Sequence, residues 1–171
     1  MVGRVRIQKM PTPTLRTAEP RDAVNIVDLA RELAEFEQLA YQFELTSGAL
    51  IRHLFGPRPV AEAVVAEVEG QVVAYALFFT NFSTFLGRPG LYLEDLYVQP
   101  LHRGTGIGQS LLQHLAGLAV ARDYGRFEWS VLDWNEAAIR FYRRMGADVL
   151  PDWRICRVTG NALHQLAGLP D

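Results

Sequence analysis

The sequence lacks several features that would point to particular classes of protein. Cysteine occurs once in 171 residues, at Cys156, which excludes an internal disulfide and a metal site built from several thiolates. We expect Cys156 to be a buried residue without a chemical role. The 17 Lys and Arg residues are outnumbered by 19 Asp and Glu residues, and the formal charge is −2. This charge does not fit a protein that binds nucleic acid through a broadly basic surface.

Long apolar runs and targeting signals are also lacking. No stretch reaches the ~18 apolar residues of a transmembrane helix, and the segment MVGRVRIQKMPTP has neither the apolar core nor the cleavage signature of a signal peptide. We therefore expect a cytoplasmic protein without a membrane partner. The histidines follow neither metal-ligand spacing nor a Ser-His-Asp order, so we predict no metal site and expect structural or surface roles for His53, His102, His114 and His164.

The remaining composition indicates one α/β domain. Apolar residues make up 49% and charged residues 21% of the chain, which is typical of soluble globular proteins, and the length suits a single domain. We expect residues 1–13 to be an N-terminal extension and residues 14–171 to form the domain. The predicted elements are a strand at 14–19, a helix opened by residues 20–22, a helix between 46 and 56, two strands around a turn at 69–70, a strand at 91–98, a helix at 107–122, a strand at 126–132, a helix at 135–146 and a last strand at 152–160.

The stretch LYLEDLYVQPLHRGTGIG (91–108) holds the strongest functional signal. It places Gly104, Gly106 and Gly108 between a strand and a helix. Glycine lets the backbone adopt left-handed conformations and approach a ligand closely, and a helix N-terminus presents free N–H groups to an anion. The alternative is a tight turn that needs glycine for its geometry alone, but three glycines after His102 and Arg103 exceed that need. We therefore predict a phosphate-binding turn.

Two common phosphate-binding loops do not match this stretch. The loop of nucleotide hydrolases requires G-x-x-x-x-G-K-[ST], and neither Lys-Ser nor Lys-Thr follows the glycines. The dinucleotide-binding loop requires G-x-G-x-x-G, and Gln109 occupies the position of its last glycine. The pattern that fits is Arg-x-x-Gly-x-Gly, formed by Arg103, Gly106 and Gly108.

This pattern resembles the acetyl-CoA pyrophosphate loop of the GCN5-related N-acetyltransferase (GNAT) superfamily. The segments RTAEPRD (16–22), LYLEDLYVQPLHRGTGIGQSLL (91–112) and WNEAAIRFYRRMGA (134–147) are similar to its spermidine/spermine (diamine) acetyltransferase subgroup. The segments RELAEFE (31–37) and DWR (152–154) match that subgroup on its substrate side. The resemblance runs from Leu15 to Leu163 and implies an α/β fold, in which helices flank a mixed sheet with splayed parallel strands.

The resemblance also implies an acetyl-CoA site between two parallel strands, here 91–98 and 126–132. The first strand's backbone would bind the pantetheine arm, the amides of the glycine turn would bind the pyrophosphate, and two later residues would contact the far side of the cofactor. The implied cofactor-binding residues are Leu96, Tyr97, Val98, Arg103, Gly104, Thr105, Gly106, Ile107, Gly108, Asn135 and Tyr142.

Two residues, Glu94 and Tyr142, are implied to be catalytic. An alkylammonium has a pKa of roughly 10 and must lose a proton before its nitrogen can attack a thioester. Glu94 matches the family glutamate that accepts this proton, directly or through water, and Tyr142 matches the tyrosine that protonates the departing thiolate. The alternatives are packing beside Phe141 for Tyr142 and solvent-exposed decoration of the strand for Glu94 and Asp95. Because side chains alternate along a strand, Glu94 and Asp95 are expected to point to opposite faces.

The implied acceptor is a small cationic amine of the polyamine or diamine type. The residues implied to bind it are Phe36, Glu37, Phe85, Glu94, Asp95 and Trp153. Phe36 replaces the tyrosine usual in the subgroup, and Phe85 replaces a tryptophan in a segment that is one residue longer. A lysine-like amino acid such as thialysine is therefore an alternative acceptor. Glu37 as a solvated charge on a helix and Trp153 as a packing residue are the structural alternatives.

Two functional hypotheses from different classes follow. The first is an enzyme that transfers acetyl from acetyl-CoA to a primary amine, as a homodimer like its family and without nucleic acid or membrane partners. The second is a regulatory domain that binds CoA without turnover. The presence of both Glu94 and Tyr142 favours the enzyme, because a protein that only binds CoA needs neither.

Overall fold

The computed structural model describes residues 13–169, in two compact units that meet in the chain at Ser130 and Val131. The first unit holds a five-stranded sheet in the order β1-β2-β3-β4-β5. Neighbouring strands are antiparallel except β4 and β5, which are parallel. The strands are β1 (Thr14–Thr17), β2 (Glu62–Val68), β3 (Gln71–Ser83), β4 (Arg88–Val98) and β5 (Phe127–Trp129). The predicted α/β class with a mixed sheet is confirmed, and all but one residue of the expected N-terminal extension lies outside the described residues.

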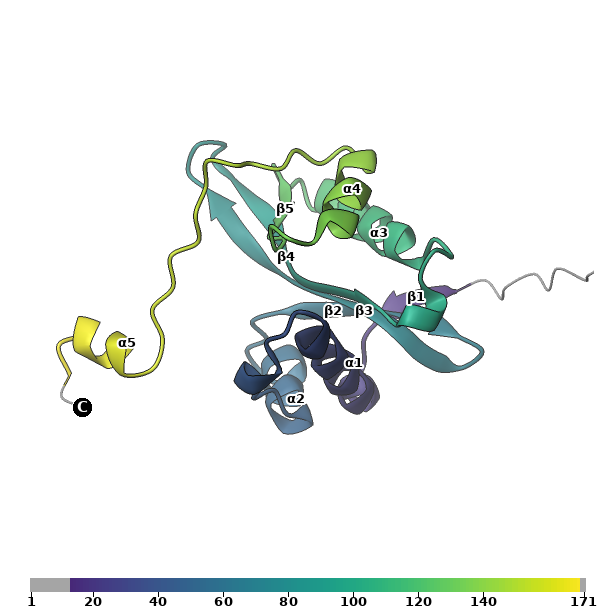
Figure 1. Cartoon of the computed structure of the whole chain (residues 1–171), viewed down its shortest axis with the longest axis horizontal. Coiled ribbons are helices and arrows are strands. Elements are labelled where there is room, and N and C mark those ends of the chain that lie inside the picture. Colours follow the sequence, from purple (N-terminus) through teal and green to yellow (C-terminus); the bar gives the residue numbers. More distant parts are fainter. Residues whose placement is uncertain (1–12, 170–171) are drawn as a thin grey trace, which may run out of the picture. The chain divides into compact units, whose positions relative to one another are not determined.

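Helices cover both faces of this sheet (Figure 1). One face carries α1 (Ala23–Phe36), which follows the short helix η1 (Pro20–Asp22), and α2 (Ser47–Phe55); the other carries α3 (Ile107–Ala121). Two further short helices, η2 (Ala40–Gln42) and η3 (Pro100–His102), lie in connections. The core under α1 joins Ile26 and Leu29 of the helix to Val65 and Tyr75 of the sheet. No helix within residues 13–169 is both long and apolar enough to cross a bilayer.

Local sequence signals set the boundaries of several elements. The connection between β2 and β3 has φ angles of 50° at Glu69 and 81° at Gly70, and such a left-handed pair matches the twist of a two-residue hairpin. The N-terminus of α2 is capped by Thr46, whose Oγ1 accepts a hydrogen bond from the Ala49 amide at 3.2 Å. Both features agree with the predicted positions.

β4 carries one extra residue in its pairing with β3. Leu93 pairs with Phe78 and Asp95 pairs with Leu77, so Glu94 has no residue opposite it. Directly paired residues point to the same face, whereas consecutive residues of β3 point to opposite faces. This β-bulge therefore places Leu93 and Asp95 on opposite faces, although a regular strand would place them on the same one. Leu77 packs against the core under α1, and Asp95 shares its face.

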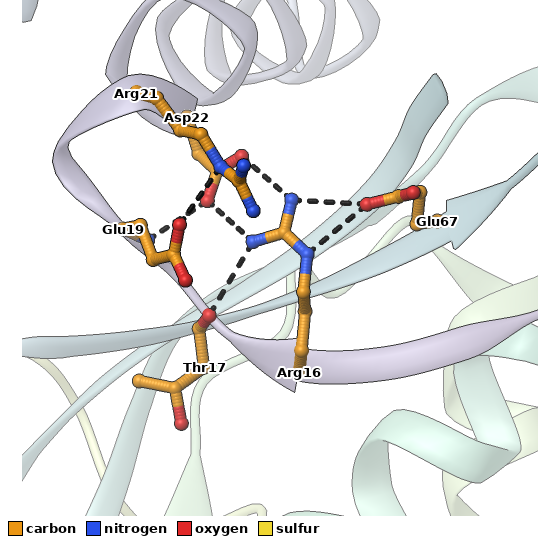
Figure 2. A network of polar contacts seen from close by, with 6 residues as sticks. All are labelled: Arg16, Thr17, Glu19, Arg21, Asp22 and Glu67. Atoms are coloured by element: carbon orange, nitrogen blue, oxygen red, sulfur yellow. Dashed lines mark hydrogen bonds and ion pairs between the residues drawn. The ribbon is translucent and has the colours of Figure 1, made fainter. Parts of the chain in front are cut away.

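The entry to α1 is held by a network of charged side chains (Figure 2). The Arg16 guanidinium donates to both carboxylate oxygens of Asp22, at 2.7 and 2.8 Å, and its Nε donates to Glu67 at 3.0 Å. Asp22 is only 3% exposed and also accepts from the Glu19 amide at 2.8 Å. The hydrogen bonds from Arg16 hold the pKa of Asp22 below its ordinary value. This network joins β1, β2 and the start of α1.

The second unit contains α4 (Glu136–Arg144) and α5 (Asn161–Leu166). The Asn135 side chain accepts from the Ala138 amide at 3.2 Å and caps α4, and the helix ends before Gly146, whose φ is 92°, as predicted. The prediction of a last strand at 152–160 is wrong, because this segment is irregular and exposed. A strand needs a hydrogen-bonded neighbour, and no strand within residues 13–169 pairs with it. The expected burial of Cys156 is also wrong, since its side chain is exposed.

Candidate active site

The glycine turn lies between β4 and α3 and has the geometry of an anion site. Gly104 and Gly106 have φ angles of 77° and 92°, which side chains disfavour. A Cβ atom added at either position would meet no heavy atom within 4 Å, so open space borders the backbone at both glycines. Thr105 closes the turn by donating its hydroxyl to the carbonyl oxygen of His102 at 2.6 Å. The first N–H groups of a helix lack intrahelical acceptors, and those of α3, from Ile107 onward, begin directly after this turn.

Arg103 is anchored within the protein by both its backbone and its side chain. Its amide donates to the Pro100 carbonyl at 3.2 Å, and its Nε donates to the Val98 carbonyl at 2.9 Å. The guanidinium lies 5.2 Å from the ring centre of Phe36 and 5.3 Å from that of Tyr97, within the range of cation–π attraction. This residue therefore links the glycine turn to the C-terminal end of α1.

The backbone of β4 extends beyond its pairing with β5. The two parallel strands pair only from Leu91 with Phe127 to Leu93 with Trp129, whereas β4 continues to Val98. The predicted pantetheine-binding residues Leu96, Tyr97 and Val98 lie in this continuation. Within the described residues no strand pairs with that edge of β4 after Leu93, so its peptide groups face the side where β5 has ended.

Two carboxylates converge between the end of α1 and β4. Glu37 follows the last residue of α1, and Asp95 lies on the α1 face of β4. Burial, followed by the negative charge of Asp95, raises the pKa of Glu37. Burial is also the main cause that raises the pKa of Asp95, and the charge of Glu94 adds to it. Within residues 13–169, no lysine, arginine or histidine forms an ion pair with Glu37, Glu94 or Asp95.

Tyr75 supplies a hydrogen bond to this acidic cluster. Its hydroxyl donates to Asp95 Oδ2 at 3.0 Å, and this bond acts to lower the pKa of Asp95 against the larger effect of burial. Tyr75 itself has no exposed surface, and burial raises the pKa of its phenol well above the ordinary value. Glu94, in contrast, is exposed at the bulge. We call Glu37, Glu94, Asp95 and Tyr75 the acidic cluster.

The predicted acceptor residues do not all come together in the first unit. Phe36 lies beside Glu37 and under Arg103, close to the cluster. Phe85 is 96% exposed in the connection between β3 and β4, beside the Ser83–Arg88 pair. β4 runs from Arg88 to Asp95 at roughly 3.3 Å per residue, so about 20 Å of strand separates this connection from Asp95. Within one chain, the structure does not bring Phe85 to the acidic cluster.

Three predicted site residues belong to the second unit. Asn135 uses its side chain to cap α4. Tyr142 lies within α4, with its ring centre 5.3 Å from that of Phe141, so the packing contact given as its alternative is present. Trp153 is 77% exposed in the irregular segment after α4.

Sequence reasoning missed Tyr75, which lies in the apolar run VVAYALFF and gave no sign of a site. It also missed Glu32, which accepts from the Tyr97 hydroxyl and from Gln99 Nε2, both at 3.0 Å. The register of β3 against β4 places Tyr75 near Asp95. Tyr75 pairs with Tyr97, and Leu77, two residues further along β3, pairs with Asp95. No group of three or more potential metal ligands lies within residues 13–169.

Comparison with known proteins decides the family. Residues 25–147 match the model of the acetyltransferase (GNAT) family. The chain belongs to this family. It is therefore an acetyltransferase, and acetyl-CoA is the cosubstrate that the family uses. Its open glycine turn, the N-terminus of α3 and the unpaired edge of β4 fit such a cosubstrate, because they offer backbone donors to phosphate and to amide groups.

Curated relatives cover nearly the whole acetyltransferase chain. Thialysine N-epsilon-acetyltransferase of Mus musculus is 38% identical over 93% of this chain and 99% of its own length. L-ornithine N5-acetyltransferase of Arabidopsis thaliana is 32% identical over 89% of this chain and 86% of its own. Spermidine/spermine N(1)-acetyltransferase-like protein 1 of Homo sapiens is 32% identical over 90% of this chain and 23% of its own. These relatives support N-acetyl transfer to an amine as the activity of the acetyltransferase.

Solved structures agree with the fold. An integron cassette protein from V. cholerae superposes with a TM-score of 0.76 at 23% identity and covers 91% of this chain and 97% of its own. A ribosomal-protein-alanine N-acetyltransferase from Brucella melitensis superposes with a TM-score of 0.67 at 23% identity, over 87% of this chain and 100% of its own. At this level of identity, the likeness concerns the fold alone.

Proposed function

We propose that the acceptor of this acetyltransferase is the primary amine of a small cationic molecule, which receives acetyl directly from acetyl-CoA. The acidic cluster is the observation that carries the proposal. Glu37 and Asp95 are carboxylates with raised pKa values, and the described basic residues form no ion pair with either of them. Uncompensated negative charge in a partly desolvated site attracts a cation strongly, because screening by water is reduced there.

The cosubstrate would be held mainly by backbone groups. We assign the pyrophosphate to the amides from Gly104 to Gly108, and the pantetheine arm to the free edge of β4 at Leu96–Val98. Arg103 contributes by fixing the turn, since its own amide and Nε are engaged by Pro100 and Val98. Asn135 and Tyr142 are assigned to the far side of the cofactor from the family pattern. When bound, acetyl-CoA supplies the thioester carbonyl that the amine attacks.

Proton transfer sets the demands on the side chains. An alkylammonium with a pKa of roughly 10 must be deprotonated before it reacts, and an exposed carboxylate at the bulge, Glu94, can accept that proton directly or through water. Asp95, on the α1 face of β4, holds the cation in place. Tyr142 would donate a proton to the departing thiolate, for which a phenol is a suitable general acid. No covalent enzyme intermediate is needed.

The class of acceptor can be narrowed by comparing molecules that differ in their second charged group. A polyamine or diamine presents a second ammonium, which suits two carboxylates. The relatives named for thialysine and L-ornithine favour an amino acid with a terminal amine instead. Release of CoA from acetyl-CoA should be measured with spermidine, putrescine, thialysine, L-ornithine and a neutral-tailed amine. Glu37→Gln should raise KM for the preferred charged acceptor and leave the neutral-tailed amine nearly unaffected; equal losses for all five would contradict a substrate-binding role for Glu37.

The same panel separates the enzyme from a regulatory domain that only binds CoA. Stimulation of CoA release by spermidine, putrescine, thialysine or L-ornithine supports the proposed acceptor class, whereas stimulation by the neutral-tailed amine alone contradicts it. Binding of acetyl-CoA without release by any of the five contradicts it.

Cosubstrate binding at the glycine turn has a matched control in the chain. Gly106 and Gly146 both have a φ of 92°, and an added Cβ would meet nothing within 4 Å at either. Alanine at either position therefore carries a similar backbone strain. We expect Gly106→Ala, but not Gly146→Ala, to reduce the increase in Tm that acetyl-CoA produces. Equal increases in both variants would contradict the assignment of the pyrophosphate to this turn.

We further propose that residues 14–171 act as one acetyltransferase domain and that the protein is a cytoplasmic homodimer. The family match crosses both units, which supports the single domain. Several large apolar side chains of the second unit are exposed in the single chain, including Trp153, Ile155 and Leu166, and a second copy could cover them. The molar mass from light scattering should be about twice that of one chain, and Trp153→Ser with Ile155→Ser should lower it. A monomer at micromolar concentration would contradict the homodimer.

A further inference from the structure

Tyr75 is a buried residue of the first unit that carries a hydroxyl and to which no function has been assigned. It lies on β3, has no exposed surface, and forms part of the core under α1. A phenylalanine would fill the same space without a hydroxyl. A buried hydroxyl costs free energy unless it is hydrogen bonded, and this hydroxyl donates to Asp95 Oδ2 at 3.0 Å. The hydroxyl is therefore explained by Asp95 rather than by packing.

In the hydrogen bond between Tyr75 and Asp95, the phenol is the donor and the carboxylate is the acceptor. Burial raises the pKa of Tyr75 well above its ordinary value, so the phenol stays protonated and its hydrogen is available to the carboxylate. The bond favours the charged form of Asp95, whereas burial and Glu94 favour the neutral form. Glu37 faces the pair from the end of α1, and its charge interacts with both Asp95 and Tyr75. Tyr97, which pairs with Tyr75 across β3 and β4, also interacts electrostatically with the Tyr75 phenol.

We propose that Tyr75 is a positioning residue, whose hydroxyl orients the Asp95 carboxylate and keeps it ionised to receive a cationic amine. This inference rests on the proposed function, since it concerns the same acceptor. Tyr75 holds one oxygen of Asp95, and no side chain within residues 13–169 donates to the other, which is left for the ligand. The β-bulge at Glu94 makes the arrangement possible, because it brings Asp95 onto the face where Tyr75 lies.

The test measures amine binding against pH, with CoA present so that no turnover occurs. Putrescine and thialysine serve as probes, because their terminal amines remain protonated below pH 8. Loss of affinity as the pH falls then reports protonation of the protein. In Tyr75→Phe, we expect the midpoint of this loss to move upward by about one pH unit, since a hydrogen bond to a charged group contributes about 1.5 kcal/mol and one pKa unit corresponds to about 1.4 kcal/mol. KM for acetyl-CoA should change by less than about twofold.

Tyr124→Phe is the control. The Tyr124 hydroxyl shares a hydrogen bond with Thr80 Oγ1 at 2.7 Å, and neither residue belongs to the acidic cluster or to the assigned cosubstrate site. Its loss should leave the midpoint unmoved. Tyr75→Phe should also add nothing to the affinity loss of Asp95→Asn. An unmoved midpoint in Tyr75→Phe, or an equal shift in both phenylalanine variants, would overturn the positioning role.

Two further measurements keep the outcome decisive. Should Tyr75→Phe fail to fold, 3-fluorotyrosine at position 75 retains the shape of the ring and makes the phenol a stronger donor. The midpoint should then move downward, and an upward or absent shift would overturn the proposal. Failure of the proposed function is distinguishable, because the unmodified protein would then neither bind the two amines nor acetylate them. The inference fails on its own if the unmodified protein binds them with a clear acid midpoint that Tyr75 does not influence.

Discussion

Two groups of charged side chains in the first unit contrast in their electrostatic balance. In the Arg16 network, a guanidinium contacts Asp22 and Glu67, and the pKa of Asp22 is lowered. In the acidic cluster, Asp95 accepts a hydrogen bond from Tyr75, no described basic residue balances the negative charges, and the pKa values of Glu37 and Asp95 are raised. The first group stabilises the fold. The second carries negative charge that no described basic residue neutralises, which costs stability and fits the proposed binding of a cationic acceptor.

The largest expected effect concerns the Arg16 network. Asp22→Ala should lower the free energy of unfolding by about 3 kcal/mol, because it removes a nearly fully buried carboxylate and leaves the partly buried Arg16 without its main partner. Urea denaturation of the variant and of the unmodified protein would measure the difference. Asp28→Ala, which removes an exposed i,i+3 pair with Arg31, is the control and should cost less than about 0.5 kcal/mol. A similar loss in both variants would contradict the structural role of the network.

The opposite behaviour is expected of Asp95→Asn. Acetyl transfer to the preferred amine should fall about 100-fold in kcat/KM, equivalent to about 2.7 kcal/mol, while Tm is unchanged or rises because a desolvated charge is removed. Steady-state kinetics and thermal unfolding together test this. Asp123→Asn, which loses a largely exposed pair with Arg88, should retain full activity. A fall in both Tm and kcat/KM would instead indicate that Asp95 stabilises the fold, as Asp22 does.

The pH dependence of stability should distinguish the two groups by sign. A lowered folded pKa at Asp22 means that the unfolded chain binds the proton more tightly. Its stabilisation is thus present above the unfolded value of about 3.9 and is lost as the pH falls through the folded pKa. Raised folded pKa values at Glu37 and Asp95 mean that stability falls as the pH rises from the unfolded values through the folded ones.

Urea midpoints between pH 3 and pH 8 would measure both trends. In Asp22→Asn, the loss of stability as the pH falls should become smaller. In Asp95→Asn, the loss of stability as the pH rises should become smaller. If both substitutions changed the pH dependence of the urea midpoint in the same direction, the proposed contrast between the Arg16 network and the acidic cluster would be wrong.

The smallest effect is expected at the outer edge of the Arg16 network. Glu67 is 30% exposed at its side chain and accepts from Arg16 at 3.0 Å. Because water screens the pair and Arg16 keeps its two bonds to Asp22, Glu67→Gln should cost less than about 1 kcal/mol. A loss as large as that of Asp22→Ala would indicate that the three side chains act as one unit. A double-mutant cycle with Asp22→Ala would measure that coupling.

Elements with a local signal could be predicted from the sequence. The hairpin turn at Glu69 and Gly70, the cap of α2 at Thr46 and the end of α4 before Gly146 each depend on a few adjacent residues. The glycine turn belongs with them, since Gly104 and Gly106 adopt the conformations that their residue type allows. These predictions needed no knowledge of distant contacts.

Features that depend on distant contacts could not be predicted in this way. The bulge at Glu94 arises from the register of two strands, and no residue type marks it in the sequence. The contact of Tyr75 with Asp95 joins positions 20 residues apart. The segment 152–160 has the β-rich composition of a strand but lacks a partner strand in the described chain, so composition alone gave the wrong prediction. The assigned roles of Asn135, Tyr142 and Trp153 remain predictions from the family pattern.

The bulge at Glu94 also bears on how the chain can change over time. A strand with strict alternation tolerates substitution but not the loss of one residue, because deletion exchanges its inner and outer surfaces. Here deletion of Glu94 would remove the bulge and restore strict alternation, while Asp95 would keep its pairing with Leu77 and stay on the face of Tyr75. The bulge therefore lets β4 carry one more exposed carboxylate, Glu94, without changing the face on which Asp95 and the residues after it lie. Alignments of related acetyltransferases that place a gap at Glu94 would mark chains that keep the buried acid and have lost the exposed one.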